Sequence, residues 1–283
     1  MPLTFALALL LAASPLSFTE RVDGARAAER ARYTFVIGAT RPFDEVYPRS
    51  VFEKKVRREV AEERVLSREF GMQVTAELLS AEYERIEKET RAPDQWEAIK
   101  KSLGGSRRKI EEVVCRPGLV DRVLRARFAF DQKIHEAEHQ KAREARQVFL
   151  AGKTPKGSST IRLSRKSEPV GTDELLAKAR SEASGPKILA PDEPGKKSDA
   201  PVPVDPDMAK VLEKELKTKG DVTTILEERN RFSVFRLMTS DAGEWLVEAV
   251  QVPKRDFDRW LDAVLKTAKP SAGLPGHLGV AKK

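Results

Sequence analysis

Apolar and polar residues follow a helical spacing over residues 51–86. Gly71 divides this stretch, because a glycine in the left-handed conformation ends a helix without Cβ strain. Thr75 can then cap a second helix with its hydroxyl group. The apolar positions are Phe52, Val56, Val60, Leu66 and Phe70 before the break and Leu79, Tyr83 and Ile86 after it. The pattern predicts a hairpin of two amphipathic helices that needs other helices to cover its apolar face.

Further helices are expected up to residue 150. Pro93 suits the first turn of one helix. Ser106 can cap another, which Pro117 interrupts because proline cannot donate a hydrogen bond to the preceding turn. A long helix is expected over residues 118–134. Its continuation over residues 135–146 is almost wholly polar, which predicts a connector that projects from the bundle.

The stretch from residue 151 to 204 has a different composition. It is rich in Pro, Lys, Asp and Gly, and large apolar residues are rare in its second half. Such a segment cannot bury enough surface to offset an ordering entropy of about 1–2 kcal/mol per residue. A partly disordered linker is therefore expected, with a candidate strand at residues 160–163 and a candidate short helix at 173–183.

Regular structure is expected again from Asp205 onward. Asp205 and Pro206 are a typical N-cap and first helical residue. Runs rich in β-branched and aromatic residues, separated by turn residues, predict strands. The expected elements are a helix over 205–216, strands over 222–226, 232–237 and 245–252, and a helix over 257–265. An earlier β-prone run lies at residues 33–37.

Composition narrows the function classes. The 283 residues are enough for two domains, and 34% charged with only 6% aromatic residues favours solvated helices over one large core. The net charge is +8, but acids are interleaved with the bases and no Cys/His finger occurs, so nucleic acid is not an expected partner. The single cysteine, Cys115, allows no intrachain disulfide and is expected to be a buried apolar residue.

The most apolar run of the chain covers residues 3–18. It is similar to the apolar region of a signal peptide and is too short and too proline-interrupted for a stable membrane span. Ala25-Arg26-Ala27 fits a cleavage site, with Ala13 as an alternative, although no Lys or Arg precedes Phe5. The run therefore predicts export, either cleaved or acting as an anchor, and a buried N-terminal helix is the alternative interpretation.

The predicted hairpin also carries a family resemblance. The first helix ends in Phe70-Gly71-Met72, Val74-Thr75 opens the next, and Glu82-Tyr83 and Ile86 follow within it. This order resembles the N-terminal region of the SurA/PrsA-type periplasmic folding factors. In that family a helical chaperone region is coupled to parvulin-type prolyl isomerase domains. The resemblance implies a periplasmic chaperone.

A second resemblance lies between residues 212 and 237, and it departs from the family where the chemistry should be. The matching residues are Leu212, Leu216, Gly220, Asp221, Val222, Ile225, Leu226, Phe232, Val234, Phe235 and Leu237. Their order looks like the C-terminal part of a parvulin domain, whose active members carry a Gly-(Tyr/Phe)-His motif. Phe232 and Ser233 occupy the expected histidine position, and the family's Gly-Gly-Asp-Leu-Gly and Met-x-x-x-Phe elements are missing. We therefore expect the isomerase chemistry to be lost, with no catalytic residue and no cofactor.

The chain's three histidines, His135, His139 and His277, lie outside that position. The string from His135 to His139 does fit the zinc-protease pattern H-E-x-x-H, which places both histidines on one helix face. The neighbouring residues are polar, whereas such a helix has an apolar inward face, and no later ligand has a recognisable spacing. A solvated histidine pair without metal is expected, with a metalloprotease as the alternative.

These patterns predict an α+β fold, mostly α. The expected parts are an N-terminal apolar segment or signal peptide (1–27), a helical SurA-like chaperone domain (28–150), the linker (151–204), a degenerate parvulin-like helix-strand segment with the C-terminal helix (205–268), and a flexible tail (269–283). By analogy with the family, strand 245–252 and helix 257–265 are expected to pack on residues 33–37 and the hairpin.

The predicted function is passive holding of unfolded or extended client polypeptides. Helices 51–70, 75–90 and 118–134 form the expected cradle. The candidate client contacts are Phe52, Tyr83, Trp96 and Phe128, each of which also fits a core position. Two alternatives stay open: an active prolyl isomerase of the same family, and a helical scaffold protein with one dedicated partner.

Overall fold

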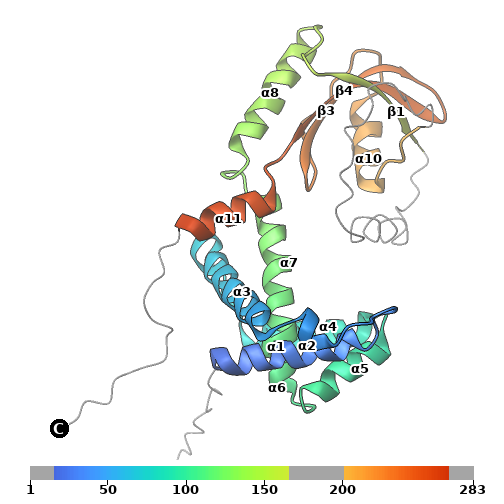
Figure 1. Cartoon of the computed structure of the whole chain (residues 1–283). Helices are drawn as coiled ribbons and strands as arrows, with labels where there is room; N and C mark the ends of the chain where they lie inside the picture. Colours follow the sequence, from blue (N-terminus) through green and yellow to red (C-terminus); the bar gives the residue numbers. More distant parts are fainter. Residues whose placement is uncertain (1–15, 166–200, 268–283) are drawn as a thin grey trace, which may run out of the picture. The chain divides into compact units, whose positions relative to one another are not determined.

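The computed structural model describes residues 16–165 and 201–267, which form two compact units. Unit 1 takes the chain up to Phe128 and again from Phe257, and unit 2 takes Ala129–Asp256. The chain therefore enters unit 2 once and returns once (Figure 1). The described residues are mostly helical and contain one four-stranded antiparallel sheet, which confirms the predicted class.

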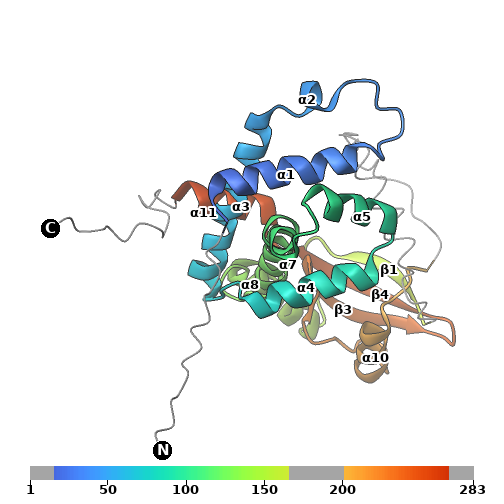
Figure 2. The same cartoon turned by 90° about the horizontal axis from the view of Figure 1, so that it is seen from below.

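Unit 1 is helical. Its elements are α1 (Phe18–Tyr33), α2 (Phe43–Val46), α3 (Arg49–Phe70), α4 (Ala76–Glu89), α5 (Pro93–Ser102), α6 (Arg107–Ile110), the π-helical turn η1 (Glu111–Cys115), α7 (Arg116–Ala129) and α11 (Phe257–Thr267). Helix α1 lies against α3 and α5, as Figure 2 shows. The apolar stripes of these helices, with Phe52, Val56 and Trp96 among them, meet in one core.

The predicted helix ends of the hairpin are confirmed. Gly71 follows α3 with a φ of 63°, in the left-handed conformation. The Thr75 hydroxyl accepts a hydrogen bond from the Leu78 N–H at 3.4 Å and so caps α4. Ser106 caps α6 in the same way, accepting from the Lys109 N–H. Local capping chemistry therefore suffices to define these ends.

The predicted interruption at Pro117 is wrong. Helices α6 and α7 form one rod, and η1 between them widens a single turn. There the Arg116 N–H bonds to the Glu111 carbonyl five residues back. Proline has no N–H and clashes with the carbonyl four residues before it in a regular helix. The wider turn accommodates the ring without breaking the helix.

Helix α11 completes unit 1 and packs on α3, as predicted for the hairpin. The Trp260 ring lies 6.0 Å from the Phe70 ring, and Asp262 accepts a hydrogen bond from Arg58 at 3.3 Å. The Phe257 ring meets the Phe128 ring of α7 edge to face at 5.3 Å. A helix from the end of the chain thus covers the apolar ends of α3 and α7.

The strand predicted at residues 33–37 does not exist. Helix α1 continues through Tyr33, and the next residues form a turn in which the Phe35 and Val36 N–H groups bond to the Arg32 and Tyr33 carbonyls. The expected packing of strand 245–252 on this run is wrong for the same reason. That strand lies inside the sheet of unit 2.

The N-terminal apolar run lies mostly outside the described residues, but the predicted boundary at residue 27 falls within α1. Ser17 and Glu20 form a reciprocal capping box at the start of this helix. Val22, Ala25 and Ala28 are buried in the unit 1 core. Cleavage after Ala27 would therefore remove core residues, whereas cleavage near Ala13 would leave α1 whole.

Unit 2 is a sheet covered on both faces. The strands are β1 (Ser159–Ser164), β2 (Leu226–Glu227), β3 (Arg231–Ser240) and β4 (Glu244–Pro253), in the order β1-β4-β3-β2. Helix α8 (Glu136–Leu150) covers one face and α10 (Pro206–Glu215) the other (Figure 1). On β3, Val234 faces α8 while Phe235 and Leu237 face α10. This period of two is the expected pattern for a sheet buried on both sides.

The predicted polar connector at residues 135–146 is wrong. Helix α7 ends at Ala129, and α8 is a separate helix that packs on the sheet. Its contact face is Ala142, Ala145 and Phe149, at a spacing of three and four residues. The alanines are small enough to let the helix approach the strands closely. Two of its three apolar contacts therefore have little hydrophobicity to mark them in the sequence.

Three of the other four strand predictions are confirmed, and the fourth is confirmed only in part. The strand expected at 160–163 is confirmed as β1, which belongs to the sheet, and those at 232–237 and 245–252 lie within β3 and β4. The strand expected at 222–226 is reduced to β2 and one bridge at Val222, because the Thr224 N–H bonds to the Glu215 carboxylate instead of a strand. The helix expected at 173–183 lies outside the described residues.

Candidate functional site

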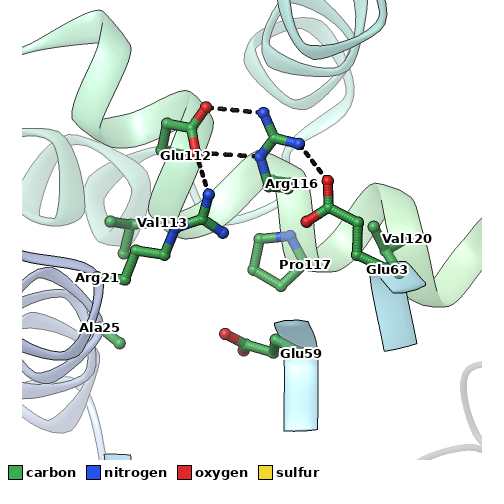
Figure 3. A pocket seen from close by; sticks show the side chains of 9 residues that line it. All are labelled: Arg21, Ala25, Glu59, Glu63, Glu112, Val113, Arg116, Pro117 and Val120. Carbon is green, nitrogen blue, oxygen red and sulfur yellow. Dashed lines mark hydrogen bonds and ion pairs between the residues drawn. The ribbon is translucent and has the colours of Figure 1, made fainter. Parts of the chain in front are cut away.

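A half-buried cluster of charged residues lies at the π-helical turn of unit 1 (Figure 3). Arg116 forms two hydrogen bonds to the Glu112 carboxylate, at 2.8 and 3.0 Å, and one to Glu63 of α3 at 2.6 Å. Arg21 of α1 binds the same Glu112 carboxylate at 2.9 Å. Three helices are therefore joined through one carboxylate and one guanidinium.

Glu59 points toward the same cluster and is weakly paired. Lys55, one turn earlier on α3, is its ion-pair partner at 3.8 Å. Burial raises the pKa of the Glu59 carboxyl, and the positive charges of Lys55 and Arg21 offset this only in part. The cavity between these side chains has a volume of about 10 Å³. That is room for about one water molecule, which is too little for a substrate.

The chemistry of this cluster is structural. Arg116 is engaged by Glu112 and Glu63, Glu112 is engaged by Arg116 and Arg21, and no hydroxyl or thiol nucleophile lines the cavity. Cys115 is buried nearby in the core, and burial raises the pKa of its thiol to about 12, so it is not a reactive thiolate. The cluster holds α1, α3 and α7 together and does not form an active site.

The four candidate client contacts lie mainly inside unit 1. Phe52, Trp96 and Phe128 are 2%, 5% and 5% exposed, so in this conformation they form core and present no surface to a client. Tyr83 is half-buried, and the Arg107 guanidinium covers its ring at 4.5 Å. The core interpretation of these four positions is the one that their burial favours.

The exposed apolar surface of unit 1 lies instead at the end of α1. Phe35, Val36 and Ile37 are 44%, 53% and 101% exposed. We call these three residues the apolar turn. Three consecutive large apolar residues before Gly38 mark this position in the sequence, but their composition predicts a strand and not an exposed turn. An exposed run of this kind is unusual unless it has a function.

A surface hollow of about 460 Å³ lies along α1, and Thr34, the residue before the apolar turn, is one of its lining residues. It is lined by Asp23, Arg26, Ala27, Arg30, Ala31 and Thr34 of α1 with Ser102 of α5. Asp44 of α2 binds both Arg26 and Arg30, and Arg49 of α3 binds Asp23. These ion pairs fix three of the charged side chains that line the hollow, and Ala27 and Ala31 are its apolar lining residues.

The two described histidines, His135 and His139, are not part of a metal-ligand cluster. The expected solvated histidine pair is wrong, because His135 is the buried N-cap residue of α8, with a non-helical ψ of 16°, and the ring of the half-buried His139 lies 5.1 Å from that of Phe232. Within residues 16–165 and 201–267, no group of three or more His, Cys, Asp or Glu residues could hold a metal ion. The zinc-protease alternative therefore has no ligand set in the described part of the chain.

The position that the resemblance assigns to a catalytic histidine is also filled. Phe232 packs against α8, and the buried Ser233 hydroxyl donates a hydrogen bond to Glu228 at 2.5 Å. Neither side chain can act as a base.

Among the described helices, none is both long and apolar enough to cross a membrane. Comparison with family models, with characterised proteins and with solved structures finds no match to this chain.

Proposed function

We propose that this chain is an exported folding factor of the SurA-like kind that holds extended client polypeptides and has lost isomerase chemistry. The observation that carries the proposal is the apolar turn, Phe35 to Ile37, beside the hollow on α1. The sequence resemblance of the hairpin supports the same class of protein.

The apolar turn suits reversible holding. Burying one exposed aliphatic or aromatic side chain is worth about 1.5–3 kcal/mol. The free energy of burying three such side chains, after the cost of association is subtracted, corresponds to weak binding. A client can then dissociate without a conformational change of the protein. The hollow adds space for a client side chain, and the ion pairs of Asp44 with Arg26 and Arg30 hold two of its lining side chains in place.

The proposed loss of isomerase chemistry is supported by the groups at the parvulin-like position. Phe232 is in the core, and the Ser233 hydroxyl is hydrogen-bonded to the Glu228 carboxylate. A general base must be within hydrogen-bond reach of its substrate. A protease-coupled peptide assay tests this part of the proposal, and turnover above the spontaneous rate would favour the active isomerase instead.

The holding activity is tested by fluorescence anisotropy of a labelled unfolded outer-membrane protein with the full chain. The full chain is needed because a start at Ala28 would remove the first ten residues of α1. We expect saturable binding that is absent for the folded client. Replacing Phe35, Val36 and Ile37 together by Ser should raise Kd at least about tenfold, equivalent to 1.4 kcal/mol, with little change in Tm.

The matched control is Leu150→Ser, which removes an exposed apolar side chain from α8 of unit 2 and should leave Kd unchanged. If the full chain binds the client but the triple variant binds equally well, the client site lies elsewhere. If the full chain does not bind any unfolded client, the holding function is wrong. A single stoichiometric partner would then favour the scaffold alternative.

A further inference from the structure

Lys254 is a buried lysine at the end of β4 in unit 2. Its side chain is 1% exposed. The ammonium group donates hydrogen bonds to the Ala129 carbonyl at 2.5 Å and to the Glu227 carboxylate at 2.8 Å. It also lies 4.9 Å from the Phe130 ring centre and 4.6 Å from that of Phe232. One cation thus satisfies a carbonyl, a carboxylate and two aromatic faces.

The place of this lysine in the chain is informative. Ala129 is the first residue of unit 2, and Lys254 stands two residues before its last, Asp256. The ammonium group therefore joins the two segments by which the chain enters and leaves unit 2. The Lys254 N–H bonds in addition to the Asn230 carbonyl at 2.8 Å, which fixes its backbone to the β2–β3 turn.

In unit 1, the residues next to the two points where the chain passes between the units are also in contact with each other. Phe128 and Phe257, the residues next to the boundary, are in ring contact within unit 1. The Arg125 guanidinium covers the Phe257 ring at 4.2 Å and binds Asp258 at 3.3 Å. The two chain segments that run across the boundary are therefore held together by separate contacts in each unit.

We propose that Lys254 is a latch that closes unit 2 at its base, so that residues 129–256 form an inserted domain that opens independently of unit 1. A buried ammonium cannot be removed without leaving a carbonyl and a carboxylate short of a partner. Losing the latch frees both ends of unit 2 at once. This inference does not depend on the proposed holding function.

Hydrogen exchange of the intact chain, read by mass spectrometry, tests the latch. Lys254→Met keeps most of the length of the unbranched side chain and removes the ammonium group. We expect the amides of β2, β3 and β4 to exchange at least about fivefold faster in this variant, because the base of unit 2 opens more often. The amides of α3 and α4 in unit 1 should keep their rates.

Two further variants make the result decisive. Lys156→Met removes an exposed lysine of the same unit and should change nothing. Glu227→Gln keeps an acceptor for Lys254 and should give a smaller increase in the same segments, which is informative if Lys254→Met unfolds unit 2 entirely. Unchanged exchange in Lys254→Met would show that there is no latch. An equal increase in α3 and α4 would show that the two units do not open independently.

Discussion

The two units of this protein are stabilised by different means. Unit 2 buries both faces of a sheet, and its largest fully buried side chains, Trp245, Phe149 and Phe235, belong to the apolar clusters on those two faces. Unit 1 consists of helices with narrow apolar stripes, and half-buried ion pairs lie between the helices. Glu82 of α4 is 4% exposed and binds Arg122 of α7. In unit 1, part of the high charge content is therefore structural and not only a solvated surface.

The largest expected effect is a loss of stability in unit 2 alone. Trp245→Ala removes a side chain that is wholly buried under the Arg165 guanidinium. Such a truncation costs about 3–5 kcal/mol. The two remaining tryptophans, Trp96 and Trp260, both belong to unit 1. In urea, the circular dichroism of the variant should change earlier than its fluorescence, because unit 2 unfolds first.

Trp245→Phe is the matched control for that experiment, since it leaves the same two fluorophores and most of the volume. Its two signals should separate much less. A fluorescence midpoint that falls as far as the circular dichroism midpoint in Trp245→Ala would mean that the stability of unit 1 depends on unit 2.

A smaller effect is expected from the charged cluster of unit 1. Arg116→Ala leaves Glu63 without its 2.6 Å partner and Glu112 with Arg21 alone. Breaking a buried pair from one side costs about 3–5 kcal/mol, and these side chains are 10–29% exposed, so we expect about 2–3 kcal/mol. Urea unfolding should show the loss, and Arg127→Ala, on the exposed face of α7, should show none.

The smallest effect is the pH dependence that arises from Glu59. Its folded pKa is raised by burial, so the folded state binds the proton more tightly than the unfolded state. Stability is then lost as the pH rises from the unfolded to the folded pKa. Glu59→Gln cannot ionise and should be more stable than the natural chain at pH 7, with no advantage near pH 4.

Thermal unfolding at both pH values checks this prediction, with Glu69→Gln at the exposed end of α3 as the control. A Glu59→Gln variant that is less stable than the natural chain at pH 7 would mean that the ionised carboxylate contributes more to the cluster than its burial costs.

The helix ends at Gly71 and Thr75 and the strands β3 and β4 follow from the sequence because the determining contacts are local. Gly71 and Thr75 act within one turn of their own helices, and β3 and β4 show their aromatic and β-branched runs directly. The face of α8 was missed because Ala142 and Ala145 become apolar contacts only where a sheet lies close enough. Their role depends on strands about a hundred residues later.

The candidate site was only half visible for a related reason. Phe35, Val36 and Ile37 have high strand propensity, and propensity assumes a partner strand. The described sheet lies in the other unit, so these side chains remain exposed in a turn. Phe52, Trp96 and Phe128 are equally apolar, yet the neighbouring helices bury them. Sequence patterns indicate which residues are apolar, but not which of them are buried by neighbouring elements.

The sequence by itself determined the helix hairpin, its caps, the strands β1, β3 and β4 and the last helix, because spacing and capping act over a few residues. Only the tertiary structure decided that α11 returns to α3 while β4 pairs between β1 and β3. The same holds for the bond between Lys254 and Ala129, 125 positions apart in the chain. Such contacts depend on how complete elements pack, and no local pattern encodes the distance between their ends.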